Sequence, residues 1–265
     1  MLRRRAKWGL GLGLLLSPSA AFAGAWTLPA NTGQASVTAT MSSASAAFDS
    51  SGAVQPTPRY NKFELQDWLE YGLTDRFTGI FAPGLQHVDI AAPTDASRTG
   101  LGYAEFGGRY SLFQGQSWVT SGQVTLRVPG TNDTSNPAAI GYTDVETDVR
   151  GLFGANFTFY GMPAFVDVEI AERFRAGSPP NEFRGDFTFG VQPAERWLLL
   201  AQSFNVISEG SGSPPFASYQ YYKLQLSAVY SFTKSWSMQV GGFTTYAGRN
   251  ALQENGLVLG AWYRF

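Results

Sequence analysis

The sequence predicts an all-β protein: a transmembrane antiparallel up-and-down β-barrel of about 12 strands, with 10 or 14 as the alternatives. Three observations predict it. The chain begins with an export leader, its remainder alternates between apolar and polar residues, and it ends on a strand whose last residue is Phe265. Only 15% of the 265 residues are charged, and none is cysteine. Soluble domains carry about 25% charged residues, so the composition argues against an ordinary cytosolic enzyme. The missing cysteines exclude a disulfide scaffold and a thiolate zinc site.

Residues 1–23 have the three parts of a cleaved secretory signal peptide. Four basic residues within 3–7 precede a short apolar run at 8–16, and Ala21-Phe22-Ala23 supplies the small-x-small cleavage pattern. Cleavage leaves 15 basic and 20 acidic residues, a net charge of −5, which argues against nucleic acid as a partner. We expect residues 24–33 to form a short periplasmic segment and residues 34–265 to form the barrel.

Residues 144–159 show the alternation most clearly. Asp144, Glu146 and Asp148 fall on one face, whereas Val145 and Val149 fall on the other. A period of two is typical of strands with two different faces. Applied along the chain, this pattern predicts twelve strands at residues 34–48, 60–73, 77–89, 101–113, 117–129, 144–159, 163–175, 182–192, 197–207, 219–232, 235–247 and 255–265.

The connections between these strands alternate in length. Tight links at 73–76, 114–116, 160–162, 193–196 and 233–234 follow the even strands, and longer polar links follow the odd ones. Outer-membrane barrels have short turns on one side and long loops on the other. We expect the loops at 90–100, 129–143 and 208–218 to form a gate.

Bulky aromatic residues cluster near the tight turns and the C-terminus. Amphipathic rings favour the membrane–water boundary, so these residues are predicted to form an aromatic girdle on the periplasmic side. The girdle residues are Tyr71, Phe113, Trp118, Phe159, Tyr160, Trp197, Tyr230, Phe232, Trp236 and Tyr263.

The last strand carries the most specific local signal. Leu257, Leu259, Ala261, Tyr263 and Phe265 share one face, and Tyr263 with the terminal Phe265 resembles the assembly signal of bacterial outer-membrane proteins. We therefore expect the protein to lie in the bacterial outer membrane. Its expected partners are outer-membrane lipid and lipopolysaccharide, the barrel-assembly machinery during biogenesis, and a small solute of unknown identity.

The charged residues of the strands must point into the barrel, because lipid does not accommodate them. The predicted lumen-lining residues, ten acidic and nine basic, are Lys62, Glu64, Glu70, Glu105, Arg109, Arg127, Asp144, Glu146, Asp148, Arg150, Asp167, Glu169, Arg173, Arg175, Glu182, Arg184, Asp186, Lys223 and Arg264. Two interpretations remain open. These charges line an aqueous path that selects a solute, or they pair into a network that fills a small barrel.

No residue pattern predicts catalysis or a cofactor. Hydrolases of the outer membrane rely on a histidine with positioned partners, and the single histidine, His87, has only Asp89 near it on its face. The acidic cluster Asp144, Glu146 and Asp148 offers oxygen ligands for a cation such as Ca²⁺, and divalent ions of the lipopolysaccharide layer are an equal alternative to a defined metal site. We expect a non-enzymatic protein with no catalytic residue, no resident metal and no cofactor.

One segment resembles a known family. Residues 68–87, WLEYGLTDRFTGIFAPGLQH, are similar to a strand–turn–strand core found in the proteobacterial outer-membrane transporters of the MetA pathway of phenol degradation. The mature start at 24–34 and the terminal strand are similar in style. The resemblance implies a barrel that passes hydrophobic or aromatic small molecules, and it assigns no binding residues.

These observations predict a channel or transporter for passive passage of a small solute. Two alternatives stay open. One is a closed structural or surface barrel without transport. The other is an outer-membrane hydrolase, which the single histidine disfavours.

Overall fold

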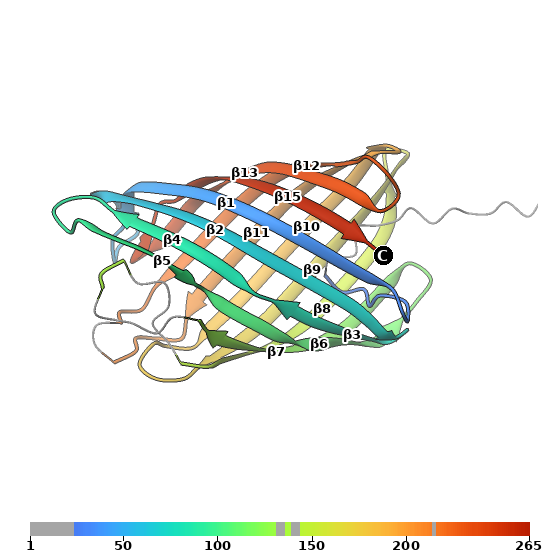
Figure 1. Cartoon of the computed structure of the whole chain (residues 1–265), viewed down its shortest axis with the longest axis horizontal. Coiled ribbons are helices and arrows are strands. Elements are labelled where there is room, and N and C mark those ends of the chain that lie inside the picture. Colours follow the sequence, from blue (N-terminus) through green and yellow to red (C-terminus); the bar gives the residue numbers. More distant parts are fainter. Residues whose placement is uncertain (1–23, 131–135, 139–143, 214–215) are drawn as a thin grey trace, which may run out of the picture.

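The computed structural model describes residues 24–130, 136–138, 144–213 and 216–265. Over these residues the chain forms one antiparallel sheet that closes into a barrel of twelve strands, so the predicted fold class is confirmed (Figure 1). No helix in the described part of the chain is long and apolar enough to cross a membrane.

Three of the twelve strands are locally interrupted, namely β3 with β4, β5 with β6, and β14 with β15. The strand segments are β1 (Gly33–Phe48), β2 (Val54–Thr74), β3 (Phe77–Ala82), β4 (Gly84–Ile90), β5 (Ala96–Leu101), β6 (Tyr103–Gln114), β7 (Trp118–Pro129), β8 (Glu146–Phe159), β9 (Met162–Arg175), β10 (Glu182–Ala194), β11 (Trp197–Ser208), β12 (Gln220–Ser231), β13 (Trp236–Arg249), β14 (Ala251–Leu252) and β15 (Asn255–Arg264). We call the end with the short connections the turn end, and the opposite end the loop end.

The strands near the first loops extend farther than the sequence predicts. β2 begins at Val54 rather than at residue 60, and β5 occupies residues that were expected to belong to loop 90–100. His87 pairs with Thr99, and Val88 pairs with Arg98. The prediction of that loop is wrong because backbone pairing continues through polar residues whose side chains show no alternation. Only residues 91–95 connect the two strands.

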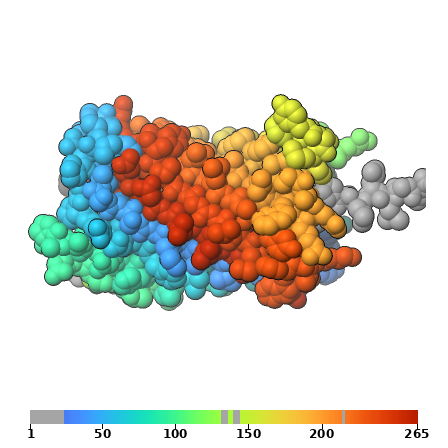
Figure 2. Space-filling model, turned by 90° about the horizontal axis from the view of Figure 1, so that it is seen from above, coloured from blue at the N-terminus to red at the C-terminus, as the bar shows by residue number. Residues whose placement is uncertain are grey.

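The barrel closes where β1 pairs with β15 on one side and β2 on the other. Ten residue pairs join β1 to β15, from Gln34↔Arg264 to Ser43↔Asn255. The N–H of Gly33 donates to the main-chain oxygen of Phe265 (2.7 Å). In return, the N–H of Phe265 donates to the carbonyl oxygen of Gly33 (3.0 Å). Figure 2 shows the blue N-terminal and red C-terminal strands side by side on the outer surface.

The two faces of the sheet differ in chemistry. Large apolar side chains such as Leu226, Val240 and Leu257 are 57–62% exposed on the outside, whereas Arg109, Thr125 and Glu146 are almost fully buried inside. A water-soluble protein rarely exposes a continuous apolar surface of this kind. The mean hydropathy of −0.12 is therefore the average of an apolar exterior and a polar interior.

Aromatic rings join into a band around the outside of the turn end. Trp236 packs on Tyr263 (4.5 Å between ring centroids), Tyr263 stacks on Phe265 (5.7 Å), and Phe265 stacks on Tyr71 (6.5 Å). Tyr230 is half-buried between Trp197 and Phe232. The remaining residues of the expected girdle are exposed. The contacts of Phe265 carry this band across the closing strand β1.

The barrel closure can be tested at Gly33. A Cβ on Gly33 would lie 2.2 Å from the ring of Phe265, so Gly33→Ala must displace that ring from its stacking partners. We expect a loss of about 1–3 kcal/mol in the free energy of unfolding, measured by urea titration in lipid vesicles. A second change, Phe265→Ala, should make the Gly33→Ala substitution nearly neutral.

The control is Gly185→Ala, because a Cβ at Gly185 meets no atom within 4 Å. Equal losses for Gly33→Ala and Gly185→Ala would contradict the assignment of Phe265 to the closure.

Candidate functional site

The interior of the barrel carries a dense network of ion pairs on one side of its wall. Arg127, Arg150, Arg173, Arg175 and Arg184 contact six carboxylates there, at N···O distances that include 2.7 Å for Arg127–Glu105, 2.9 Å for Arg175–Glu146 and 3.0 Å for Arg173–Asp148. The six carboxylates are Glu105, Glu146, Asp148, Glu169, Glu182 and Asp186.

Strand register places these opposite charges together. Glu146 of β8 lies opposite Arg127 of β7 and Arg175 of β9, and Arg173 of β9 lies opposite Asp148 and Glu182. Glu146 and Asp148 are each 2% exposed, so ion pairs of this kind are needed to compensate the desolvation of their carboxylates. The sequence left two interpretations of these charges open. On this side of the wall, the arginines and carboxylates are paired with one another, as the second interpretation expects.

The other predicted interior charges occupy separate positions. Arg109 pairs with Glu70 near the turn end, Lys62 pairs with Glu64 (3.1 Å), and Lys223 pairs with Glu254 (2.5 Å). Arg264 contacts only the side-chain oxygen of Gln34, at 3.4 Å, and has no carboxylate partner among the described residues.

Two predicted interior acids behave differently from the rest. Asp144 was expected within a strand, but it lies two residues before the start of β8 and is exposed beside Gly177. The alternation in the sequence continues beyond the paired strand. Asp167 is 3% exposed, and within the described residues it accepts a hydrogen bond from the N–H of Ala25 but has no ion-pair partner.

The opposite side of the interior wall, formed by β11, β12, β13, β15 and β1, is mostly uncharged. Gln225 donates to Gln202 (3.0 Å), and Gln239 donates to Ser227 (2.9 Å). Short residues follow on β1 and β15, where Thr38 lies opposite Gly260. The interior is thus divided into a charged, self-paired side and a neutral side with shorter side chains.

Apolar residues line the neutral side at the turn end. Phe165, Leu200, Val229 and Trp262 form one buried cluster, with Leu198 packed against it. A cavity of about 1190 Å³ opens there, lined in part by Phe165, Leu198, Val229 and Trp262, and by the charged residues Glu195, Arg196, Lys234 and Arg264. An apolar lining is unusual in the interior of an outer-membrane barrel, which is typically polar.

The residues before β1 enter the barrel at the turn end (Figure 1). Ala25 is fully buried against Val119 and Leu152, and Trp26 packs edge-on against Phe165. The N–H of Leu28 donates to the hydroxyl of Thr78 (2.8 Å). Within residues 24–33, for which the sequence predicts a periplasmic segment, residues 25–28 pack against interior side chains.

Two glycines make room for this N-terminal segment. A Cβ at Gly154 would lie 2.5 Å from the ring of Trp26, and a Cβ at Gly72 would lie 2.1 Å from the carbonyl oxygen of Pro29. A larger residue at either position would displace the segment. The N-terminal segment therefore depends on glycine at positions 72 and 154 for its position inside the barrel.

The long loops contribute to the loop end. Of the expected gate loop 129–143, residues 131–135 and 139–143 lie outside the described part of the chain. Ala138 is fully buried against Val88, whose side chain faces the interior from β4. In loop 208–218, where residues 214–215 are not described, the N–H of Ser213 donates to the carbonyl oxygen of Ser178 (3.0 Å).

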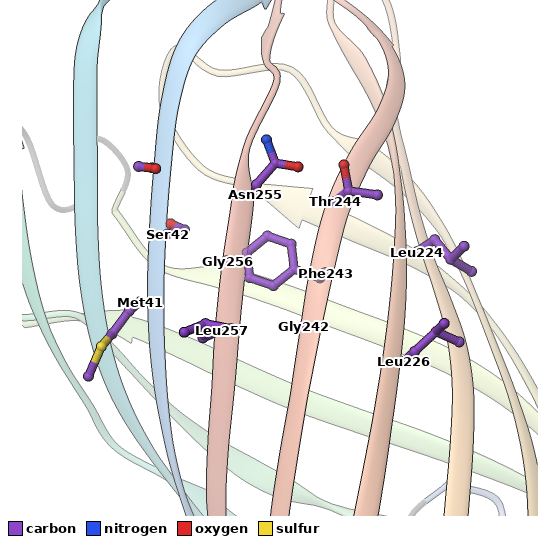
Figure 3. Close-up of a pocket in the computed structure, with 11 residues that line it drawn as sticks. Met41, Ser42, Leu224, Leu226, Gly242, Phe243, Thr244, Asn255, Gly256 and Leu257 are labelled. Atoms are coloured by element: carbon purple, nitrogen blue, oxygen red, sulfur yellow. The ribbon is translucent and has the colours of Figure 1, made fainter.

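A second groove, of about 640 Å³, lies on the outside over β12, β13, β15 and β1 (Figure 3). The exposed side chains of Met41, Leu224, Leu226 and Leu257 border it, and Gly242 forms part of its floor. The ring of Phe243 fills the space beside Gly256, where a Cβ would lie 2.4 Å away. The groove opens outward, but two of its lining residues also contact the interior: the hydroxyl of Ser42 donates to Glu254 (3.4 Å), and the Nζ of Lys223 lies 5.2 Å from the centroid of the Phe243 ring.

Neither His87 nor the acidic cluster forms a recognisable reaction centre. The Nδ1 of His87 lies 2.8 Å from the hydroxyl of Thr99, at the loop end. Glu146 and Asp148 are engaged by arginines. Within the described residues, no three His, Cys, Asp or Glu side chains are grouped so that they could hold a metal ion.

Two residues that bind predicted interior charges were not themselves predicted. Glu254 binds Lys223, and the hydroxyl of Tyr219 donates to Glu182. Glu254 continues the even-numbered positions that face inward along β15, so extending the alternation past Gly256 would have found it. Tyr219 precedes β12, and its role depends on strand register that the sequence does not contain.

Comparison with known proteins identifies the fold through solved structures. The chain is similar to the COG4313 outer membrane channel from Pseudomonas putida F1, with a TM-score of 0.76, 15% identity, and coverage of 91% of this chain and 97% of that one. It is also similar to the NanC porin (TM-score 0.53, 8% identity, 86% and 98% coverage). A third similar structure is the translocator domain of the autotransporter NalP from Neisseria meningitidis (TM-score 0.54, 10% identity, 94% and 91% coverage).

No family model and no curated protein matches the sequence. The resemblance of residues 68–87 to the MetA-pathway transporters is therefore not supported by a family match. At 8–15% identity, the structural similarities establish the closed barrel fold.

The buried pair Glu70–Arg109 offers a test of the interior ion pairs. Both side chains are at most 3% exposed, so Glu70→Gln leaves a buried guanidinium without its carboxylate. We expect a loss of about 3–5 kcal/mol in the free energy of unfolding, and the double variant Glu70→Leu/Arg109→Met should recover most of it. Glu64→Gln is the control, because the Lys62–Glu64 pair is 23–25% exposed and should cost much less.

Proposed function

We propose that the protein is a channel of the bacterial outer membrane that passes a small solute without energy input. The observation that carries this proposal is the division of the interior. The charged side is occupied by its own ion pairs, while the neutral side offers short side chains and leads to the cavity of about 1190 Å³ at the turn end. Support for the location comes from the apolar exterior and the aromatic band at one end. Two solved structures with this fold are an outer membrane channel and a porin.

The proposal includes the biogenesis expected from the sequence. Residues 1–23 serve as a cleaved leader, and Tyr263 with Phe265 serves as the signal for the barrel-assembly machinery. Phe265 also closes the barrel through Gly33. Lipid and lipopolysaccharide then surround the apolar exterior.

The solute path follows β1, β12, β13 and β15. It runs from the loop end toward the cavity, beside the N-terminal segment, and the loops at 129–143 and 208–218 remain the expected gate. The cavity combines an apolar patch with polar and charged residues, among them Glu195, Arg196 and Lys234, and this apolar patch favours solutes with a hydrophobic or aromatic body. The resemblance of residues 68–87 to transporters of a phenol-degradation pathway points to the same class.

Flux measurements test this function. Purified protein in liposomes should increase swelling rates for small aromatic solutes more than for sugars of equal size, and should show discrete conductance in planar bilayers. A barrel that passes neither ions nor any solute of the panel would contradict the proposal and would indicate a closed surface barrel instead.

The position of the path is tested at Thr38. This residue faces inward opposite Gly260, so Thr38→Trp places a large ring on the neutral side and should reduce conductance and swelling rates severalfold. Val37→Trp is the matched control, because Val37 is the neighbouring residue on β1 and is 43% exposed on the outside. Unchanged flux in Thr38→Trp would place the path elsewhere.

A further inference from the structure

Asp167 is an exception among the interior acids. Its neighbour Glu169, two residues along the same face of β9, is held by Arg150, and Arg109 of β6 is engaged by Glu70. The large network already contains six carboxylates for five arginines. Asp167 is 3% exposed, accepts a hydrogen bond from the N–H of Ala25 at 2.7 Å, and lies within hydrogen-bond reach of the carboxyl group of Glu169. This second acid adds a like charge beside Asp167 and supplies no compensating cation. A carboxylate buried to this extent requires a cation or a proton.

The backbone of Gly24 lies directly against this carboxylate. A Cβ on Gly24 would be 2.1 Å from Oδ2 and 2.4 Å from Oδ1 of Asp167, and the φ of Gly24 is +92°. Both observations restrict position 24 to glycine, because other residues lack the space and rarely adopt this φ. The chain therefore approaches Asp167 with its backbone at residue 24.

The sequence places the expected cleavage point at the same residue. Ala21-Phe22-Ala23 is the small-x-small pattern that precedes leader cleavage, so the next residue is Gly24. We propose that cleavage between Ala23 and Gly24 creates the missing cation, and that the new α-ammonium group of Gly24 pairs with Asp167 inside the barrel. The inference rests on the export step of the proposed function.

The chemistry of this step is a peptide hydrolysis by the leader peptidase of the exporting cell. Water adds across the Ala23–Gly24 bond, the carboxylate leaves with Ala23, and the amino group of Gly24 takes up a proton. The positive charge then lies beside Asp167, next to the N–H of Ala25. The ion pair fixes the start of the N-terminal segment, while Trp26 on Gly154 fixes the following turn.

The first test is the mass of the protein purified from outer membranes. Intact mass and N-terminal sequencing should show a chain that starts at Gly24 with a free amino group. A mature start at any other residue, or a blocked amino group, overturns the inference.

The second test measures how fast an amine-reactive reagent labels the α-amino group of the folded protein at pH 7. An ion-paired, buried ammonium should react at least about tenfold more slowly than the same group in Asp167→Asn, which corresponds to 1.4 kcal/mol. Glu64→Gln is the control, because it makes the same carboxylate-to-amide change at another interior position and should leave labelling slow. Fast labelling of the unaltered protein, or slow labelling that Asp167→Asn does not change, contradicts the ion pair.

A second variant covers the case in which Asp167→Asn does not fold. Inserting one serine between Ala23 and Gly24 keeps the cleavage pattern but moves the ammonium one residue away from Asp167, so labelling should become fast. Labelling and mass do not depend on flux. A barrel without solute passage that still shows slow, Asp167-dependent labelling keeps this inference and removes the channel proposal, and the opposite result removes only the inference.

Discussion

The backbone pairing of β1 with β15 is the constraint on which the rest of the structure depends. A membrane-spanning sheet must pair every backbone N–H and C=O, and only closure removes its free edges. Ten residue pairs and the reciprocal hydrogen bonds between Gly33 and Phe265 supply this closure. Once the sheet is closed, the period-2 alternation has a defined inside and outside. The positions of the interior ion pairs, the aromatic band and the N-terminal segment all follow from that one pairing.

The interior combines two solutions to the problem of filling a barrel of this size. On the charged side, adjacent strands carry opposite charges in register, so desolvated arginines and carboxylates compensate each other. On the neutral side, amides, hydroxyls and glycines leave space, and apolar residues replace charge at the turn end. A solute without strong charge would meet few charged side chains along this second side. The strand register, which places the charges on the other side, is therefore the reason for the solute class proposed above.

Most of the barrel could be predicted from the sequence because the determining pattern is local. The alternation of Asp148, Val149 and Arg150 gives both the strand and the direction of each side chain. β5 was missed because Arg98 and Thr99 continue a ladder without an apolar face. The seating of Trp26 was missed for a different reason. Trp26 packs against Gly154, and the space that this glycine leaves for the ring becomes visible only when the two segments are placed side by side in the structure.

The even number of strands has a practical consequence for anyone who modifies this protein. It brings Ala25 and Phe265 to the turn end, where both residues make folding contacts. Ala25 is enclosed beside Asp167, and Phe265 forms part of the barrel closure. Affinity tags or fluorescent fusions at either terminus would compete with folding contacts. The connection after β11 at Gly210, where a Cβ would meet no atom within 4 Å, is a better place for an inserted epitope and would report which end of the barrel faces the cell exterior.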